Sequence, residues 1–227
     1  MRKVLSAAIT AGAASALVAG LAVIPAAATT TTWSVTPGGA FLSTIARQTR
    51  LHDLHTGGKN YACQSIKMTG TFRSGSGLVN PIGQIATMRG PSTSSIVCAL
   101  PGIAFLITFT HFPMNISARH YDAATGVTQK VITGAHIKIS TVPGHAPCTG
   151  VIDGTGPNAH DGKIPFTYAN TGGELDGELD FAQVFINLTA YNVTGCGGQI
   201  HSGDDFIYQV MAFPRTATGM ANTITSP

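Results

Sequence analysis

The sequence is poor in charge, and this limits the partners that the protein can have. Only 10% of its 227 residues are Asp, Glu, Lys or Arg, and they include no run of Lys or Arg. A protein that binds nucleic acid needs a concentrated basic surface to neutralise phosphates. We therefore expect no nucleic-acid partner.

The usual catalytic and membrane-barrel signatures are missing as well. The chain has no G-x-S-x-G, H-E-x-x-H or C-x-x-C pattern, which mark serine hydrolases, zinc proteases and many thiol sites. One Trp and five Tyr are too few for the two aromatic girdles of an outer-membrane barrel. These absences favour a non-catalytic protein over an enzyme, and they weigh against a porin.

The N-terminus has the composition of a secretory signal peptide. Arg2 and Lys3 precede an uncharged run at positions 4–24, and Pro25 and three alanines follow it. A charged region, an apolar region and a small-residue exit are the three parts of such a signal. A retained transmembrane helix is the alternative, but the many Ala and Gly make the run weakly hydrophobic. We predict that residues 1–28 are removed and that the protein is secreted, either extracellular or cell-wall associated.

The remaining chain, residues 29–227, has the size of one all-β domain. Without Arg2 and Lys3 it carries 11 basic against 10 acidic residues. Each half has a cysteine followed 14 residues later by a glycine, at Cys63 and Cys148. The sequence therefore predicts a single domain, with two similar disulfide-tied halves at about 29–141 and 142–227 as a further possibility.

All four cysteines lie in the exported part, and an even count in an oxidising compartment indicates two disulfides. Three pairings are possible. Because segments adjacent in sequence tend to be adjacent in antiparallel folds, we expect Cys63–Cys98 and Cys148–Cys196.

Alternation with a period of two, interrupted every 8–12 residues by turn formers, predicts β-strands throughout. In residues 65–73, Ile66, Met68 and Phe72 share one face. Residues 103–109 and 206–213 are apolar on both faces, as in central strands. Hairpins are expected around residues 122–126 and 170–173. The predicted fold is an all-β antiparallel sandwich or flattened barrel of about 10–12 strands.

Several short motifs resemble a known family. They are Trp33-Ser-Val-Thr-Pro-Gly-Gly-Ala-Phe41, Tyr121-Asp-Ala-Ala-Thr-Gly-Val127, Val193-Thr-Gly-Cys196 and Gly203-Asp204. In combination they resemble an uncharacterised family of small secreted β-rich proteins from actinobacteria. The resemblance implies an exported β-protein of a Gram-positive bacterium, and it assigns no catalytic residue.

An acidic stretch is a candidate cation site. On an extended strand, Glu174, Asp176, Glu178 and Asp180 share one face about 6.8 Å apart. Calcium binds 6–8 oxygen ligands and would relieve their mutual repulsion. The alternative, which a linear strand favours, is a solvated face that protects a sheet edge from aggregation.

Other polar groups have simpler structural interpretations. His201, Asp204 and Asp205 place a base beside two acids, but Gly203-Asp204 is also typical of a turn before the strand at Phe206. His52 and His55 point apart on a strand, and Trp33 and Phe41 suit a core. The remaining histidines are scattered and form no motif: His111, His120, His136, His145 and His160.

These observations favour a non-catalytic secreted or cell-wall-associated protein that binds or structures a component of the cell envelope. Calcium is the one cofactor that the sequence suggests. Three alternatives remain open: a membrane-inserting porin or pore-former, an envelope-polymer hydrolase using His201 with Asp204 or Asp205, and a carrier of an apolar ligand inside a barrel.

Overall fold

Alternating apolar and polar residues form strands over most of the described chain. The computed structural model describes residues 31–45, 49–55, 58–176 and 187–227. All strand pairs among them are antiparallel, and the expected all-β fold with two disulfides is confirmed. Their one helical element is η1, a three-residue 3-10 turn at Cys196–Gly198. No helix in this part of the chain is long and apolar enough to span a membrane.

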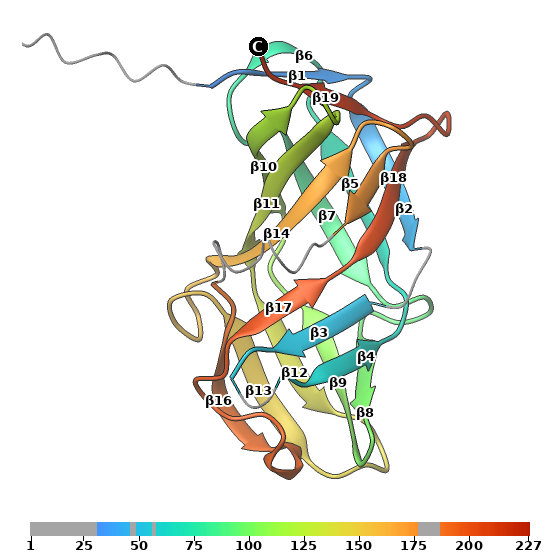
Figure 1. Ribbon diagram of the computed structural model, residues 1–227. Helices are drawn as coiled ribbons and strands as arrows, with labels where there is room; N and C mark the ends of the chain where they lie inside the picture. The colour runs from blue at the N-terminus through green and yellow to red at the C-terminus, as the bar shows by residue number, and fades with distance from the viewer. Residues whose placement is uncertain (1–30, 46–48, 56–57, 177–186) are drawn as a thin grey trace, which may run out of the picture.

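Eight strands close into a barrel, which we call the first barrel and which occupies the upper half of Figure 1. Around the ring they are β10 (Met114–Asp122), β11 (Val127–Ala135), β14 (Gly162–Ala169), β15 (Glu174–Asp176), β18 (Met211–Thr216), β2 (Gly39–Ile45), β5 (Lys67–Phe72) and β7 (Gly83–Arg89). The hairpin of β10 and β11 turns at residues 122–126 as predicted, with Asp122 opposite Val127.

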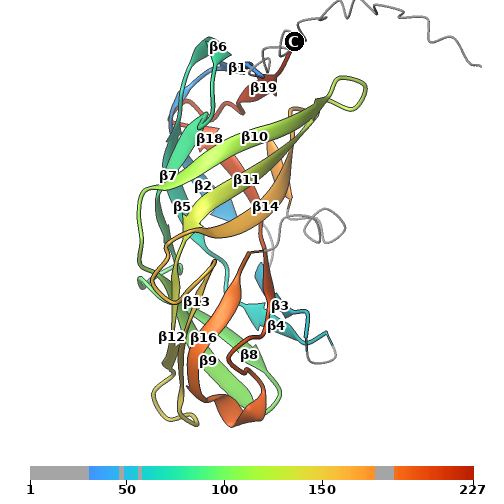
Figure 2. The same ribbon diagram turned by 90° about the vertical axis from the view of Figure 1, so that its left-hand side faces the viewer.

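Eight further strands form a second sheet below the first barrel, which we call the curled sheet (Figure 2). In order they are β16 (Thr189–Gly195), β13 (Cys148–Asp153), β12 (Ile137–Thr141), β9 (Ile103–Phe109), β8 (Ile96–Leu100), β4 (Asn60–Cys63), β3 (Thr49–Asp53) and β17 (Phe206–Gln209). Its two end strands meet where Thr189 bridges to Asp205, so the sheet curls back on itself.

A small third sheet covers the far end of the first barrel. It consists of β19 (Thr223–Thr225), β1 (Trp33–Thr36) and β6 (Gly75–Leu78). Side chains inside the barrel hold it in place, because the Tyr168 hydroxyl donates to the Asn222 carbonyl at 2.6 Å and Thr128 donates to the Ile224 carbonyl at 3.2 Å.

The chain passes repeatedly between the first barrel and the curled sheet. Connections from β9 to β10, from β11 to β12 and from β13 to β14 all cross at the junction between them, which we call the waist. Each of the two eight-stranded bodies takes strands from both sides of residue 141. Neither body therefore corresponds to one half of the sequence.

One disulfide lies within the curled sheet, the other joins this sheet to η1, and both have the expected pairing. Cys63 on β4 and Cys98 on β8 are directly opposite each other in the ladder. The second bond joins Cys148 on β13 to Cys196 in η1.

The predicted core faces are buried, but the strands are divided differently from the prediction. Ile66, Met68 and Phe72 are each at most 3% exposed. Residues 206–213 do not form one central strand, because β17 ends at Gln209 in the curled sheet and β18 begins at Met211 in the first barrel. The described chain has nineteen strands, more than the 10–12 expected, since it builds two stacked bodies and a cap.

Candidate metal centre

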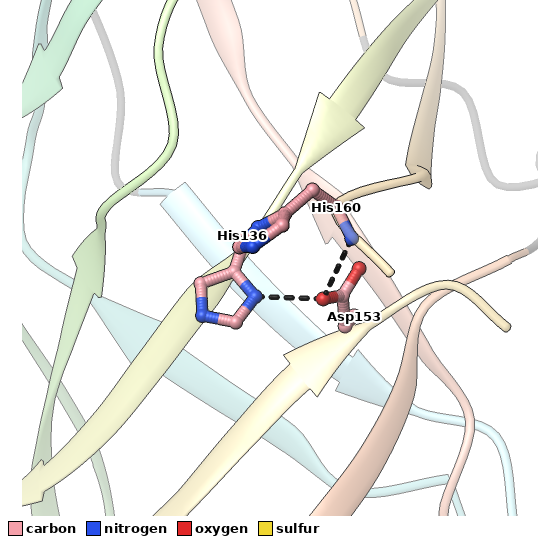
Figure 3. Close-up of side chains that lie close together, drawn as sticks. All are labelled: His136, Asp153 and His160. Carbon is pink, nitrogen blue, oxygen red and sulfur yellow. Dashed lines mark hydrogen bonds and ion pairs between the residues drawn. The ribbon is translucent and has the colours of Figure 1, made fainter. Parts of the chain in front are cut away.

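Three imidazoles and one carboxylate lie close together at the waist. Each imidazole comes from a different crossing connection, and the carboxylate comes from the end of β13. His136 is the single residue between β11 and β12, and Asp153 is the last residue of β13. His160 lies in the segment that leads to β14, and His111 follows β9. Figure 3 shows the His136 ring directed at the Asp153 carboxylate, with the His160 backbone amide close to the same oxygen.

Asp153 anchors the cluster. Its side chain is fully buried, and its two oxygens accept four hydrogen bonds. His136 Nδ1 donates to Oδ2 at 2.6 Å and the His160 backbone amide at 3.1 Å, while the amides of Gly154 and Asp161 donate to Oδ1 at 2.7 and 3.3 Å. A carboxylate has about four lone-pair positions, so this one is saturated.

Burial and hydrogen bonding act on the Asp153 carboxyl in opposite directions. Burial by itself raises its pKa, because the charged form loses its hydration. The hydrogen bonds from His136 and from the amides of Gly154 and His160 outweigh that effect and hold the pKa below its ordinary value. The carboxylate is therefore ionised near neutral pH.

An ionised carboxylate only accepts hydrogen bonds, so His136 must donate from Nδ1. In the neutral ring this leaves the lone pair on Nε2. His136 is only 9% exposed, and its orientation is set by the carboxylate. Metal-binding histidines are commonly held in this way, with one ring nitrogen on a carboxylate and the other on the ion.

His160 and His111 bring two more rings to the same place. The His160 ring centroid lies 4.4 Å from that of His136 and 4.5 Å from that of His111, on which it stacks at 22°. His160 has a backbone φ of 52°, a left-handed conformation that is strained for a residue with a side chain. The bond from its amide to Asp153 helps to hold this conformation.

The spacing suits a single small ion. One ligand atom from each of His136, Asp153 and His160 lies within 4.8 Å of the others. Zn–N bonds of about 2.0 Å place neighbouring ligands of a tetrahedral ion roughly 3.3 Å apart, so the His160 ring has to move toward the fixed His136 ring to share an ion with it. Because Asp153 is saturated, we assign it to orienting His136 and not to direct coordination. Imidazole donors suit zinc, copper or nickel, whereas calcium requires oxygen ligands.

The acidic stretch is only partly described. Glu174 and Asp176 are backbone members of β15, while Glu178 and Asp180 lie outside the described residues. The calcium site therefore stays a prediction.

His201, Asp204 and Asp205 form the predicted turn. Asp204 is 4% exposed and its Oδ2 accepts from the His201 backbone amide at 2.7 Å. The His201 ring Nδ1 is 3.6 Å from that oxygen. Asp205 instead accepts from the Thr189 hydroxyl at 2.7 Å, next to the bridge that joins the ends of the curled sheet.

The other sequence candidates are structural. The His52 ring pairs with the Asn60 side chain at 2.9 Å, while His55 is exposed. Trp33 and Phe41 are 1% and 4% exposed, which places both in the core as expected.

The sequence did not predict that the residues of the waist cluster form a site. Its members lie at positions 111, 136, 153 and 160, without a local spacing that indicates a site. The one available signal was His136, a polar residue between the apolar Ala135 and Ile137 at the point where the strand pattern changes.

Comparisons of the chain with protein-family models, with curated proteins and with solved structures found no match.

Proposed function

We propose that this protein is an exported, non-catalytic β-protein of the cell surface that binds a divalent transition-metal ion at the waist. The observation that carries the proposal is the 2.6 Å hydrogen bond from His136 Nδ1 to the buried Asp153 carboxylate, with the rings of His160 and His111 packed beside it. In this arrangement the imidazoles of His136 and His160 are the ligands, and the His111 ring stacks on that of His160.

Export is supported by the two disulfides, because such bonds persist mainly in oxidising compartments. A surface location gives the site a simple role: a bound ion ties together two connections between the first barrel and the curled sheet, the one from β11 to β12 and the one from β13 to β14. The protein then presents a rigid, elongated surface to a component of the cell envelope.

Isothermal titration with Zn²⁺, Cu²⁺ or Ni²⁺ at pH 7.5 tests the proposal. We expect one ion per chain, and we expect His136→Ala and His160→Ala to weaken binding at least tenfold, in line with typical losses at metal sites. His145→Ala is the matched control, since His145 is an exposed histidine in a turn between β12 and β13. No stoichiometric binding, or equal affinity in all three variants, contradicts the proposal.

A second candidate function is hydrolysis of an envelope polymer. The same short bond favours it, because a carboxylate that holds histidine Nδ1 also orients a general base. Release of soluble fragments from purified cell-wall material by the wild-type protein, and its loss in His136→Ala, would support this candidate. Metal binding without release supports the non-catalytic function.

A further inference from the structure

Lys130 lies inside the first barrel, where a lysine is unexpected. It is on β11, and Thr128, Lys130 and Ile132 all have 0% exposure on the same face of that strand. The closed barrel places this face in its interior. Lysine is almost never fully buried unless it is paired.

Aromatic rings surround the amine. Nζ is 3.6 Å from the ring centroid of Tyr168, 5.3 Å from that of Phe72 and 6.0 Å from that of Phe166. Phe166 is directly opposite Lys130 in the ladder, and Tyr168 is the next inward residue on β14. Among the described residues, Nζ has no hydrogen-bond partner.

This environment disfavours the ammonium form. Removing a charge from water costs more than an aromatic face returns, and no acidic group among the described residues pairs with Nζ. The titratable side chain that faces the amine is Tyr168, whose hydroxyl is engaged by the Asn222 carbonyl. Burial accordingly lowers the pKa of the Lys130 amine well below its usual value.

A neutral amine that is fully buried among aromatic rings is a nucleophile. Lysines of this kind react with carbonyl compounds, and exclusion of water protects the product from hydrolysis. The rings of Phe72, Phe166 and Tyr168 make the surroundings of the amine apolar, which favours a small, apolar partner.

We propose that Lys130 is the reactive amine of a carbonyl-binding site inside the first barrel, where it forms an imine with a small aldehyde. The Nζ lone pair forms a bond to the carbonyl carbon while the C=O π bond opens onto oxygen. Both amine protons leave with that oxygen as water, and a C=N double bond remains. The step is reversible and involves no oxidation or reduction.

This site is separate from the waist in both location and chemistry. Lys130 contacts rings on β5 and β14 inside the first barrel, whereas the imidazole cluster lies on the crossing connections. Either proposal can fail without affecting the other.

Reductive methylation of the native protein tests the inference. The probe is isotope-labelled formaldehyde, chosen because Lys130 is fully buried, with cyanoborohydride to trap the imine at pH 6.5. Peptide mapping then compares Lys130 with Lys138, an exposed lysine on β12. Because only the neutral amine reacts, we expect Lys130 to be labelled at least tenfold faster than Lys138, and we expect Lys130→Met to remove that fast phase alone.

Labelling of Lys130 at the rate of Lys138 or slower, or only after denaturation, overturns the proposal. Lys138→Met is the matched control and should leave the fast phase unchanged. Circular dichroism of both variants confirms that they are folded. The decisive rate is measured on the wild-type protein, so the test does not depend on the folding of either variant.

Discussion

Buried polar residues carry most of the chemistry that this chain offers. Asp153 and Lys130 are both fully buried, but their surroundings differ. Asp153 accepts four hydrogen bonds and keeps its charge, whereas the Lys130 amine has rings around it and no hydrogen-bond partner among the described residues. The hydrogen bonds therefore keep the buried Asp153 charged, whereas burial without a partner favours the neutral form of the Lys130 amine.

We expect Asp153 to contribute to stability in a pH-dependent way. Its pKa is lower in the folded protein than the value of about 3.9 in an unfolded chain. Protons thus bind more tightly to the unfolded state, and this contribution is present above about pH 4 and is lost as the pH falls through the folded pKa. Asp153→Asn should destabilise the protein at pH 7 and differ less from wild type near pH 3, as measured by urea unfolding. A difference that is independent of pH would contradict this assignment.

We expect Lys130→Met to make the protein more stable. Methionine fills a similar volume without the desolvation cost of an amine, which is about 1–3 kcal/mol for an unpaired buried polar group. The free energy of unfolding in urea should rise by roughly that amount. Lys138→Met, on the exposed side of β12, should change it by less than about 0.5 kcal/mol. A less stable Lys130→Met variant would show that the amine has a stabilising partner.

Single strands and hairpins follow closely from the sequence. The alternation in residues 65–73 predicts the buried face of β5, and the glycine of residues 122–126 predicts the turn of the β10–β11 hairpin, where Gly126 has a φ of 70°. Both depend only on neighbouring residues. The break at Val210 does not, because the apolar pattern continues through it while the chain leaves the curled sheet for the first barrel.

Close strand packing makes Gly70 on β5 difficult to replace. A Cβ at this position would lie 2.2 Å from the Gln84 carbonyl oxygen and 2.6 Å from the Phe41 ring. Gly70→Ala should cost about 1–3 kcal/mol, as overpacking usually does. Gly156→Ala, where a Cβ meets nothing within 4 Å, should be nearly neutral. Thermal unfolding of the two variants compares them, and equal midpoints would show that β5 can move away from β2 and β7.

At the scale of the whole molecule, the waist links two bodies that the chain enters and leaves several times. Its imidazoles come from the connections that follow β9, β11 and β13. The proposed metal site is complete only when both bodies are folded and correctly placed. We therefore expect metal binding and global stability to be coupled.

We expect Zn²⁺ to raise the melting temperature of the wild-type protein. A ligand at 100 times its Kd stabilises the folded state by about 2.7 kcal/mol, which corresponds to roughly 5–10 °C for a chain of this size. EDTA should reverse the shift, and His136→Ala should lack it. An equal shift in wild type and His136→Ala would place the ion elsewhere.

The sequence by itself determined the all-β character of the chain, the buried face of single strands such as β5, the pairing of the cysteines and the burial of Trp33 and Phe41, because alternation and turn formation act over a few residues. Only the tertiary structure decided where the sheets close and which connections meet. Closure of the sheets brings together His111, His136, Asp153 and His160, which are spread over more than 40 residues of sequence. It also places the Lys130 side chain inside the first barrel. These outcomes depend on which strands pair across long separations, and no local pattern encodes that choice.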